Sequence, residues 1–576
     1  MLFRVWAPTA GRVDLALGDD HPRMTRGDDG WWSLDLPSVV AGADYGFVVD
    51  GEGPFPDPRS PWQPRGVHGQ SRTVDHGAFT WQCEDWPATP LAQAVIYELH
   101  VGTFTPVGTF DSAIGKLDHL VQLGVTHVEV MPVAQFSGDR GWGYDGVDLF
   151  APHAAYGGPD GLKGFVDACH SRGLRVLLDV VYNHFGPAGN YLERFGPYFT
   201  ERYHTPWGKA VNYDQAYADE VRRFVIDNAL MWLRDYRFDG LRLDAIHAVL
   251  DQSAVHILEK LAAETRVLET QTGRHYDLIA ESDLNDPRLV RDVTVGGYGL
   301  DAAWSDDFHH ALHALLTGET AGYYQDFGRV ADLVAALTRI HVYDGRYSSY
   351  RQRTHGRPIG GLSASRFVVT SQNHDQVGNR AAGERLVHLA GLPRAKVAAA
   401  VLLMAPGVPL LFQGEEWAAS TPFQYFTAHE DPDLGRAVSE GRKREFAAFG
   451  WSPADVPDPQ DLATFERSRL NWGEASLESH REMLDWYRAL IAVRRAFPVL
   501  MDGDLRSVRI DFDEGERWLT MSRSEVTLAL NVGETEQSLL VPDGQGLKLA
   551  SDPCIIHSNG YVTLPPDSAA VLIGHP

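Results

Sequence analysis

The stretch GLRLDAIH, residues 240–247, places two charged side chains inside an apolar segment that is typical of a buried β-strand. Side chains on a strand alternate between its faces, so Arg242 and Asp244 point to the same side. An unpaired buried charge is costly, so we expect the two to pair or to face a wet cavity. A structural salt bridge and a catalytic pair both fit this stretch, which alone does not decide between them.

Acidic side chains also mark the ends of two other apolar runs. Glu281 lies at the end of the run YDLIAES, and Asp375 lies in QNHDQVGNR. A network that only stabilises a fold rarely needs acids from three separate strands, whereas chemistry on a sugar does. Glycoside cleavage uses two carboxyl groups that flank the bond, about 5–5.5 Å apart in retaining enzymes. The three acids therefore favour a retaining glycosidase.

Each acid then has its own task. Asp244 would attack the anomeric carbon, and Glu281 would protonate the leaving oxygen and later activate water. Asp375 would stabilise the positive charge of the transition state. Arg242 would keep the Asp244 carboxylate ionised and oriented. We expect the like charges of Asp244 and Asp375 to raise the pKa of Glu281, so that Glu281 arrives protonated.

The elements that must position these acids alternate along the chain from residue 95 onward. Apolar β-rich runs occur at 95–101, 127–133, 175–181, 240–246, 276–282, 300–306, 366–372 and 408–414. Amphipathic helical stretches lie between them, and a last helix is expected at 479–497. The pattern predicts an α/β fold, a (β/α)8 TIM barrel with its active site at the C-terminal ends of the strands. A doubly wound open sheet is less favoured, because no glycine-rich phosphate loop follows the first strand.

Short strand-like runs flank the barrel on both sides. Residues 1–90 are expected to form an N-terminal β-sandwich that resembles a carbohydrate-binding module, followed by a proline-rich connector. The catalytic barrel would span 91–498, with a short insertion after its third strand. Residues 499–576 would form a C-terminal β-sandwich. The three parts agree with a chain of 576 residues, which is too long for one ordinary core.

The composition excludes several classes of partner. The formal net charge of −26 repels phosphate backbones and anionic lipid, so we expect neither nucleic acid nor a membrane as partner. Three distant cysteines suggest neither a disulfide framework nor a zinc cluster. We find no secretory signal and no apolar run of about 18 residues, so a cytoplasmic location is expected. No metal and no cofactor are expected.

Four segments resemble the signature regions of the α-amylase superfamily, in order and on the expected strands. They are 179–184, 240–247, 279–283 and 373–375, and the resemblance covers about four hundred residues of barrel. It implies that Asp244 is the nucleophile, Glu281 the general acid/base and Asp375 the stabiliser of the transition state. Further positions match those that bind the first sugar on the minus side of the bond: Arg242, His184, His374, Tyr144 and Asp145.

Longer stretches resemble one family within that superfamily, the maltooligosyltrehalose trehalohydrolases. They include HVGTFTPVGTF, DVVYNHFGPAGNYL, ESDLNDPRLV, WSDDFHHALH and SQNHDQVGNR. The resemblance implies hydrolysis of the α-1,4 bond next to a terminal trehalose unit, with an α-glucan chain as the remaining product. It implies metabolic cooperation with a trehalose-forming synthase. It also suggests substrate contacts from Arg242, Leu243, Ala245, Ile246, His247, Asp306, Asp307, Phe308, His309, His310, His374, Gln376, Val377, Gly378 and Asn379.

Plainer interpretations remain for several positions. Asp179 and Asn183 are expected to support the site rather than react. His247 could be a core histidine or a substrate contact, and His309 and His310 could simply begin a helix. Glu415 and Glu416 are expected at a solvated strand end. Two other functions remain open: a glycogen branching enzyme, and an inactive barrel that only binds glucan.

Overall fold

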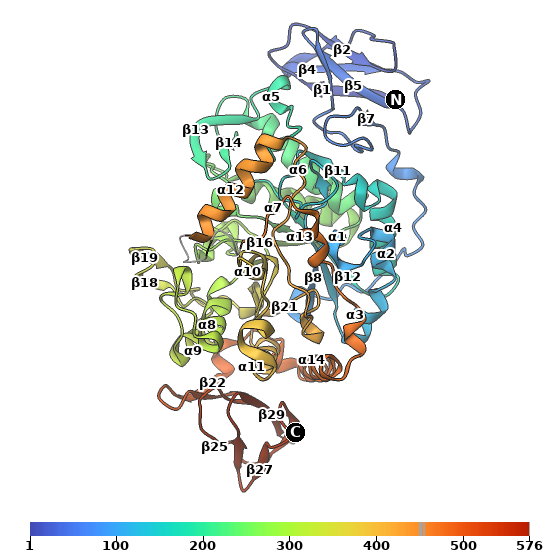
Figure 1. The fold of residues 1–576 in the computed structure, drawn as a ribbon. Helices are drawn as coiled ribbons and strands as arrows, with labels where there is room; N and C mark the ends of the chain where they lie inside the picture. The colour runs from blue at the N-terminus through green and yellow to red at the C-terminus, as the bar shows by residue number, and fades with distance from the viewer. Residues whose placement is uncertain (448–451, 453–455, 575–576) are drawn as a thin grey trace.

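The centre of the molecule is a closed barrel of eight parallel strands (Figure 1). This computed structural model describes residues 1–447, 452 and 456–574. The strands follow the order β12-β15-β16-β17-β20-β21-β8-β9 around the barrel. Each predicted run contains one of them, so the predicted (β/α)8 barrel is confirmed. They are β8 (Ile96–Leu99), β9 (His127–Val130), β12 (Arg175–Val180), β15 (Gly240–Leu243), β16 (Asp277–Ala280), β17 (Ala302–Trp304), β20 (Phe367–Thr370) and β21 (Val408–Phe412).

Burial on both faces explains why these runs form central strands. Every residue of β12 and β15 is buried, as expected for parallel strands with helices outside and a filled barrel inside. The main surrounding helices are α2 (Phe110–Ile114), α3 (Leu117–Leu123), α4 (Gly158–His170), α6 (Ala218–Asp235), α7 (Ile257–Thr272), α8 (Asp306–Thr317), α9 (Val330–Arg339), α11 (Leu386–Met404) and α14 (Glu478–Ala496).

The N-terminal module consists of two small sheets that dock on the barrel through aromatic side chains. One sheet has the order β1-β4-β3, and the other has β2-β5-β6 with β7 beside β5. The ring centroid of Trp6 lies 5.5 Å from that of Tyr198, and the ring centroid of Phe47 lies 6.2 Å from that of Phe195. Tyr198 and Phe195 belong to the segment after the third barrel strand. The strands are β1 (Leu2–Trp6), β2 (Val13–Ala16), β3 (Thr25–Arg26), β4 (Trp31–Asp35), β5 (Asp44–Val49), β6 (Glu52–Phe55) and β7 (Ser71–Arg72).

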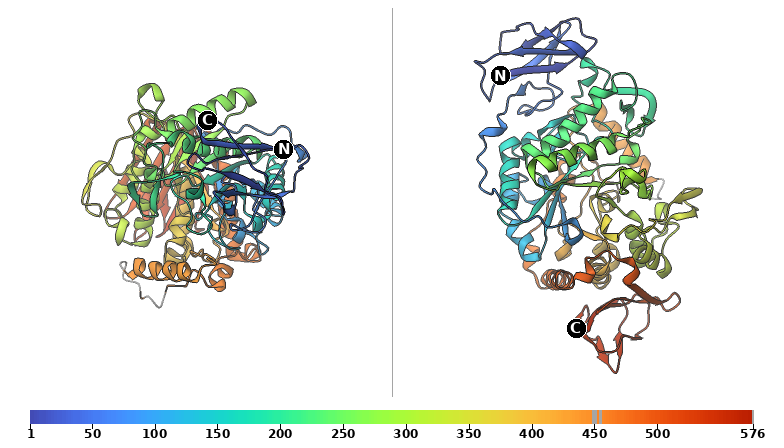
Figure 2. Two further views of the ribbon diagram at one scale, coloured as in Figure 1. Left: turned by 90° about the horizontal axis from the view of Figure 1, so that it is seen from above. Right: turned by 180° about the vertical axis from the view of Figure 1, so that it is seen from behind.

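The C-terminal domain lies at the opposite end of the barrel from the N-terminal module (Figure 2). Its sheets have the orders β22-β23-β24-β29-β26 and β25-β28-β27. The sequence runs predicted all of these strands except β26 and β27, which are largely exposed. The strands are β22 (Val508–Asp513), β23 (Trp518–Arg523), β24 (Val526–Asn531), β25 (Gln537–Leu540), β26 (Gln545–Ala550), β27 (Ile556–Ser558), β28 (Tyr561–Leu564) and β29 (Ser568–Gly574). The domain limits at 90 and 498 stay predictions.

Among the described helices, α11 alone is long and apolar enough to cross a membrane. It packs against α8, α14 and β29, and this packing between the barrel and the C-terminal domain accounts for its apolar surface.

Three insertions surround the C-terminal ends of the barrel strands. The hairpin β13 (Phe199–Thr205) and β14 (Gly208–Val211) follows β12. The hairpin β18 (Asp344–Ser348) and β19 (Arg353–Gly356) follows β17. Helix α12 (Pro432–Ala447) follows β21 and contacts the turn after β20, because Arg442 Nη2 donates to the carbonyl of Gly378 at 2.7 Å.

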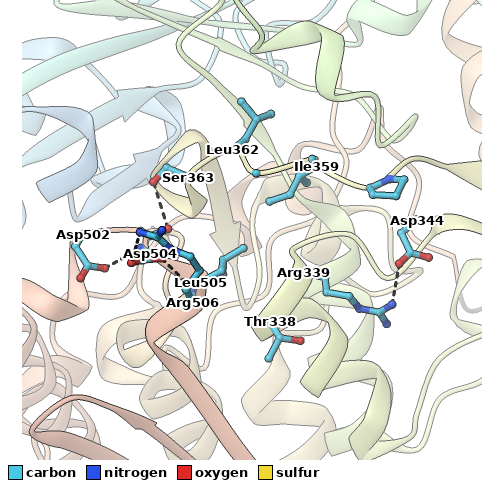
Figure 3. A pocket seen from close by; sticks show the side chains of 14 residues that line it. Thr338, Arg339, Asp344, Ile359, Leu362, Ser363, Asp502, Asp504, Leu505 and Arg506 are labelled. Carbon is cyan, nitrogen blue, oxygen red and sulfur yellow. Dashed lines mark hydrogen bonds and ion pairs between the residues drawn. The ribbon is translucent and has the colours of Figure 1, made fainter.

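A cavity of about 750 Å³ lies between the end of α9, the start of β18, residues 358–363 and residues 502–506 at the start of the C-terminal domain (Figure 3). Its charged side chains are paired: Arg339 with Asp344 at 2.8 Å, Arg506 with Asp504 at 2.9 Å, and Asp502 with Arg523 at 2.8 Å. The cavity contains none of the predicted site residues.

Candidate active site

Arg242 joins two aspartates at the centre of the site. Its guanidinium is fully buried, and Nη1 donates to the two carboxylate oxygens of Asp179 at 2.9 and 2.8 Å and to Oδ1 of Asp244 at 2.8 Å. The Trp304 ring packs on the guanidinium, with 4.4 Å between the ring centroid and Cζ. Asp244 remains 8% exposed. The two charges of the strand are therefore paired with each other, and Asp244 can still be reached from outside.

Glu281 lies against the same guanidinium, at the end of β16. Its Oε2 is 3.6 Å from Arg242 Nη2 and accepts the backbone N–H of Ala245 at 2.5 Å. Ala245 has a left-handed backbone with φ of 39°, and this turn directs its N–H at the carboxyl group. Burial, followed by the charges of Asp244, Asp306 and Asp375, raises the pKa of Glu281 well above its usual value, although Arg242 opposes the shift. Glu281 is thus suited to hold a proton at neutral pH.

Asp375 lies in the first turn of α10 (His374–Gly378), directly after β20. Its side chain is 42% exposed, and Oδ1 accepts a hydrogen bond from Asn379 at 3.1 Å. The side chain of Asn373 caps this short helix by accepting the N–H of Gln376. The cap fixes the orientation of the short helix that carries Asp375. Asp375 is the most exposed of the three predicted acids.

A chain of hydrogen bonds connects the turn at His374 to Arg242. His374 Nε2 lies 2.7 Å from the hydroxyl of Tyr144, which lies 2.7 Å from Oδ2 of Asp179. The rings of Tyr144 and His374 also stack, with centroids 5.2 Å apart. On its other side, His374 Nδ1 lies 2.5 Å from Oε1 of Glu98 on β8. The sequence analysis missed Glu98, although an acid within the buried run VIYELHV was the available signal.

His184 and Asp145 line a neighbouring pocket of about 350 Å³. The Trp207 ring stacks on that of His184 with 4.5 Å between centroids, and 47% of Trp207 stays exposed. Burial lowers the pKa of His184, against the charges of Asp244 and Asp145. His184 is therefore suited to act as a neutral hydrogen-bonding group beside the acids.

The other predicted substrate contacts divide by exposure. His247 is exposed, which rules out the core-histidine alternative, and Asn379 is exposed as well. Asp306 and Gln376 are partly exposed. Burial, followed by the charge of Asp283, raises the pKa of Asp306 to about 7. Several others are at least nine-tenths buried, namely Leu243, Ile246, Asp307, Phe308, His309, His310 and Val377.

The bonds of two buried members point to structural tasks. Oδ2 of Asp307 accepts the backbone N–H groups of Val342 and Tyr343 at 2.6 and 2.8 Å. The ring nitrogens of His309 lie 2.7 Å from the Ser371 carbonyl and 2.9 Å from the Tyr324 hydroxyl. Both residues lie in α8, so the expectation that this stretch begins a helix is confirmed.

The expectation that Glu415 and Glu416 end a solvated strand is wrong. They are only 3% and 0% exposed. Glu415 accepts hydrogen bonds from Ser371 at 2.5 Å and from Tyr487 of α14 at 2.6 Å, and burial raises its pKa to about 7. Glu416 lies 2.8 Å from Nε2 of His119. Side chains of α3 and α14 bury Glu415 and Glu416, and nothing in the sequence around these two acids indicates that burial.

Asp179 behaves as the sequence analysis expected, since both of its oxygens accept from Arg242. Within residues 1–447, 452 and 456–574, no group of three or more His, Cys, Asp or Glu side chains is arranged to hold a metal ion. The three cysteines are free thiols.

Comparisons with known proteins identify the family of the chain. The family described as alpha amylase, catalytic domain, matches residues 99–217, and carbohydrate-binding module 48 (isoamylase N-terminal domain) matches residues 1–63. The malto-oligosyltrehalose trehalohydrolase of Rhizobium sp. (strain M-11) is 50% identical over 99% of this chain and 97% of its own. That of Arthrobacter ramosus is 52% identical over 95% of both chains.

Solved structures lead to the same fold, and the branching enzymes are more distant. A crystal structure of a Salmonella typhimurium protein described as an alpha amylase has a TM-score of 0.90 and 42% identity, and covers 99% of this chain and 97% of that one. The 1,4-alpha-glucan branching enzyme of Cellvibrio japonicus is 32% identical over only 54% of this chain and 48% of its own. The chain therefore belongs to the malto-oligosyltrehalose trehalohydrolase family within the α-amylase superfamily.

Proposed function

We propose that this protein is a retaining glycoside hydrolase that cleaves the α-1,4-glucosidic bond next to the terminal trehalose unit of maltooligosyltrehalose and releases trehalose. The observation that carries the proposal is the shared contact of Asp244 and Glu281 with one guanidinium, where Asp244 is paired and Glu281 has a raised pKa. A paired carboxylate next to a protonated one is the combination that a double displacement needs. The names of the most similar relatives support the choice of substrate.

In the first step Asp244 attacks the anomeric carbon of the glucose on the minus side of the bond. Glu281 gives its proton to the leaving oxygen, so trehalose departs neutral and a covalent β-glucosyl-enzyme forms. In the second step Glu281 takes a proton from water, and the resulting nucleophile displaces Asp244 with net retention. Asp375 stabilises the positive charge that develops in both transition states.

The substrate-binding residues surround these acids. Tyr144, Asp145, His184, Arg242 and His374 hold the sugar on the minus side. Trehalose is bent by its α,α-1,1 bond, so the plus side must accept a folded disaccharide. We assign the contacts on that side to the following residues: Leu243, Ala245, Ile246, His247, Asp306, Phe308, His310, Gln376, Val377, Gly378 and Asn379. Asp307 and His309, which the sequence resemblance also places there, would support these contacts through their buried hydrogen bonds.

One incubation tests both the substrate and the stereochemistry. Maltotriosyl trehalose should yield maltotriose and free trehalose on chromatography, and proton NMR of the first products should show the α-anomer of maltotriose. Release of glucose or of maltose from the other end would contradict the substrate, and a β-anomer would contradict the retaining mechanism.

The second candidate, a branching enzyme, would pass the glucosyl intermediate to a sugar hydroxyl instead of water. Its only support is the partial match to the Cellvibrio japonicus enzyme. Amylose treated with this protein should gain no α-1,6 branches. An inactive glucan-binding barrel is disfavoured because all three acids are present. In the cell, we place the protein in the cytoplasm beside a synthase that forms the trehalose end of the substrate.

A further inference from the structure

We propose that Glu98 is a positioning residue for this hydrolysis, because it holds both the ring and the backbone amide of His374 and so fixes the turn that carries Asp375. Only the kinetic test of this role depends on the proposed function. Glu98 lies on β8 and is buried against His374, so its effect must pass through His374.

The contact between Glu98 and His374 is buried and uses both carboxyl oxygens of Glu98. Glu98 is 1% exposed and His374 is 1% exposed. Oε1 of Glu98 lies 2.5 Å from Nδ1 of His374, and Oε2 accepts the backbone N–H of His374 at 2.9 Å. β21 separates β8 from β20 in the barrel, so the contact does not join neighbouring strands. Because the carboxyl group of Glu98 contacts both the ring and the backbone N–H of His374, it fixes the position of His374.

The hydrogen bonds of Tyr144 indicate that Nε2 of His374 carries a proton. Burial raises the pKa of Tyr144 well above its usual value, so the phenol keeps its single proton. Burial raises the pKa of Asp179 only to about 6, against the charge of Arg242, so this carboxylate is ionised at neutral pH. Tyr144 therefore donates to Asp179, and the 2.7 Å contact between Tyr144 and His374 requires a proton on Nε2.

The other ring nitrogen faces the carboxyl group of Glu98, and the raised pKa of His374 indicates that this nitrogen is protonated as well. Nδ1 of His374 then donates to Glu98, and the ring is an imidazolium with both protons engaged. Burial lowers the pKa of His374, but the charges of Glu98 and Asp375 outweigh it and raise the pKa to about 9. The imidazolium lies 3.6 Å from Oδ1 of Asp375, so its charge also orients that acid.

A neighbouring acid offers a matched control. Glu129 on β9 is the register partner of Glu98, and both of its carboxyl oxygens are buried without a hydrogen-bond partner. Burial and the charge of Glu98 raise the pKa of Glu129 well above its usual value, which favours the neutral acid at Glu129. The titratable groups that face His374 are Glu98, His100, Glu129, Tyr144, Asp179, Arg242 and Asp375.

The test compares Glu98→Gln with Glu129→Gln in the full chain. Glu98→Gln should lower kcat on the order of 10²-fold, because the group next to Asp375 is misplaced, with a smaller change in KM. Glu129→Gln replaces a neutral acid by a neutral amide and should leave kcat and its pH profile close to those of the wild type. Equal losses in the two variants, or full kcat in Glu98→Gln, would overturn the proposal.

A second measurement does not depend on activity. The His374 ring resonance, assigned by its loss in His374→Gln, should titrate near pH 9 in the wild type and at a clearly lower pH in Glu98→Gln, because the charge of Glu98 contributes to the raised pKa. A ring that titrates alike in both proteins would refute the role of Glu98, even if the substrate assignment were wrong. If Glu98→Gln does not fold, Glu98→Asp keeps the charge but shortens the reach, and it should retain the raised titration while losing kcat. Unchanged kcat in Glu98→Asp would then count against the proposal.

Discussion

Arg242 Nη1 lies 2.8 Å from Oδ1 of Asp244, and the same nitrogen also contacts both oxygens of Asp179. One buried cation thus holds two carboxylates in place at the end of β15. The arrangement explains why a strand can carry two charges: Asp244 is compensated by Arg242, and Arg242 is compensated by both Asp244 and Asp179. It also distinguishes the two reacting acids. Asp244 makes the short contact with Arg242, whereas Oε2 of Glu281 lies 3.6 Å from Nη2 of Arg242.

Replacing Arg242 with Gln should destabilise the protein strongly. The change leaves Asp179 and Asp244 buried without a cation, and loss of one partner of a buried ion pair costs about 3–5 kcal/mol. We expect a lower free energy of unfolding in urea titrations, together with loss of turnover. Arg194→Gln is a suitable control, since Arg194 pairs with Glu52 at the surface and should leave the unfolding curve unchanged. Wild-type stability in Arg242→Gln would show that the ion pair is not needed.

Asp244→Ala should abolish turnover and leave binding intact. The nucleophile forms the covalent intermediate, so less than about 1% of the wild-type rate is expected. Binding of maltotriosyl trehalose can be followed by calorimetry, since no product forms. Asp244→Asn is the matched variant that keeps the side-chain size and should be equally inactive. A residual rate above about 1% in either variant would mean that another group is the nucleophile.

The barrel and its three acids could be predicted from the sequence because the signals are local. Each strand is a short apolar run. Asp244 and Glu281 directly follow β15 and β16, and Asp375 lies in the short helix α10 that comes after β20. Strand order then brings the acids to one edge, as the parallel barrel requires. The two missed strands of the C-terminal domain lack that signal, because most of their side chains face solvent.

Contacts between distant segments could not be predicted in this way. Glu98 and His374 are 276 residues apart, and only closure of the barrel brings them together. Glu416 is covered by His119, 297 residues away, so its burial is likewise set by tertiary packing. A single sequence shows that these acids exist but does not show which side chain each one meets.

The raised pKa of Glu281 predicts the alkaline side of the pH profile. Because the acid form is the proton donor, hydrolysis should persist at neutral pH and fall as the pH rises through the pKa of Glu281. The charge of Asp306 helps to raise that pKa, so Asp306→Asn should lower it and move the alkaline limb of kcat/KM to lower pH. A limb that stays in place or moves to higher pH would show that Glu281 is not the titrating acid.

Glu281→Gln provides an independent check on the same role. The variant cannot protonate the leaving oxygen, so natural substrate should react very slowly. A substrate whose leaving group needs no proton, such as a glucosyl fluoride, should still form the covalent intermediate with Asp244. Mass spectrometry should detect that intermediate in Glu281→Gln and miss it in Asp244→Ala. Its absence from both would argue against a covalent route.

Gly378 should tolerate no side chain, although it lies outside the reacting groups. A Cβ at this position would lie 2.1 Å from the ring of Trp142, which is itself buried, so the turn from His374 to Asn379 would have to shift. Gly378→Ala is therefore expected to cost about 1–3 kcal/mol of stability and to lower kcat through displacement of Asp375. Gly164→Ala in α4 is the control, because nothing lies within 4 Å of its Cβ and a gain of about 0.4–1 kcal/mol is expected there. Thermal unfolding and initial rates measured on both variants would separate a local clash from a general effect of replacing glycine, and equal behaviour of the two would contradict the clash.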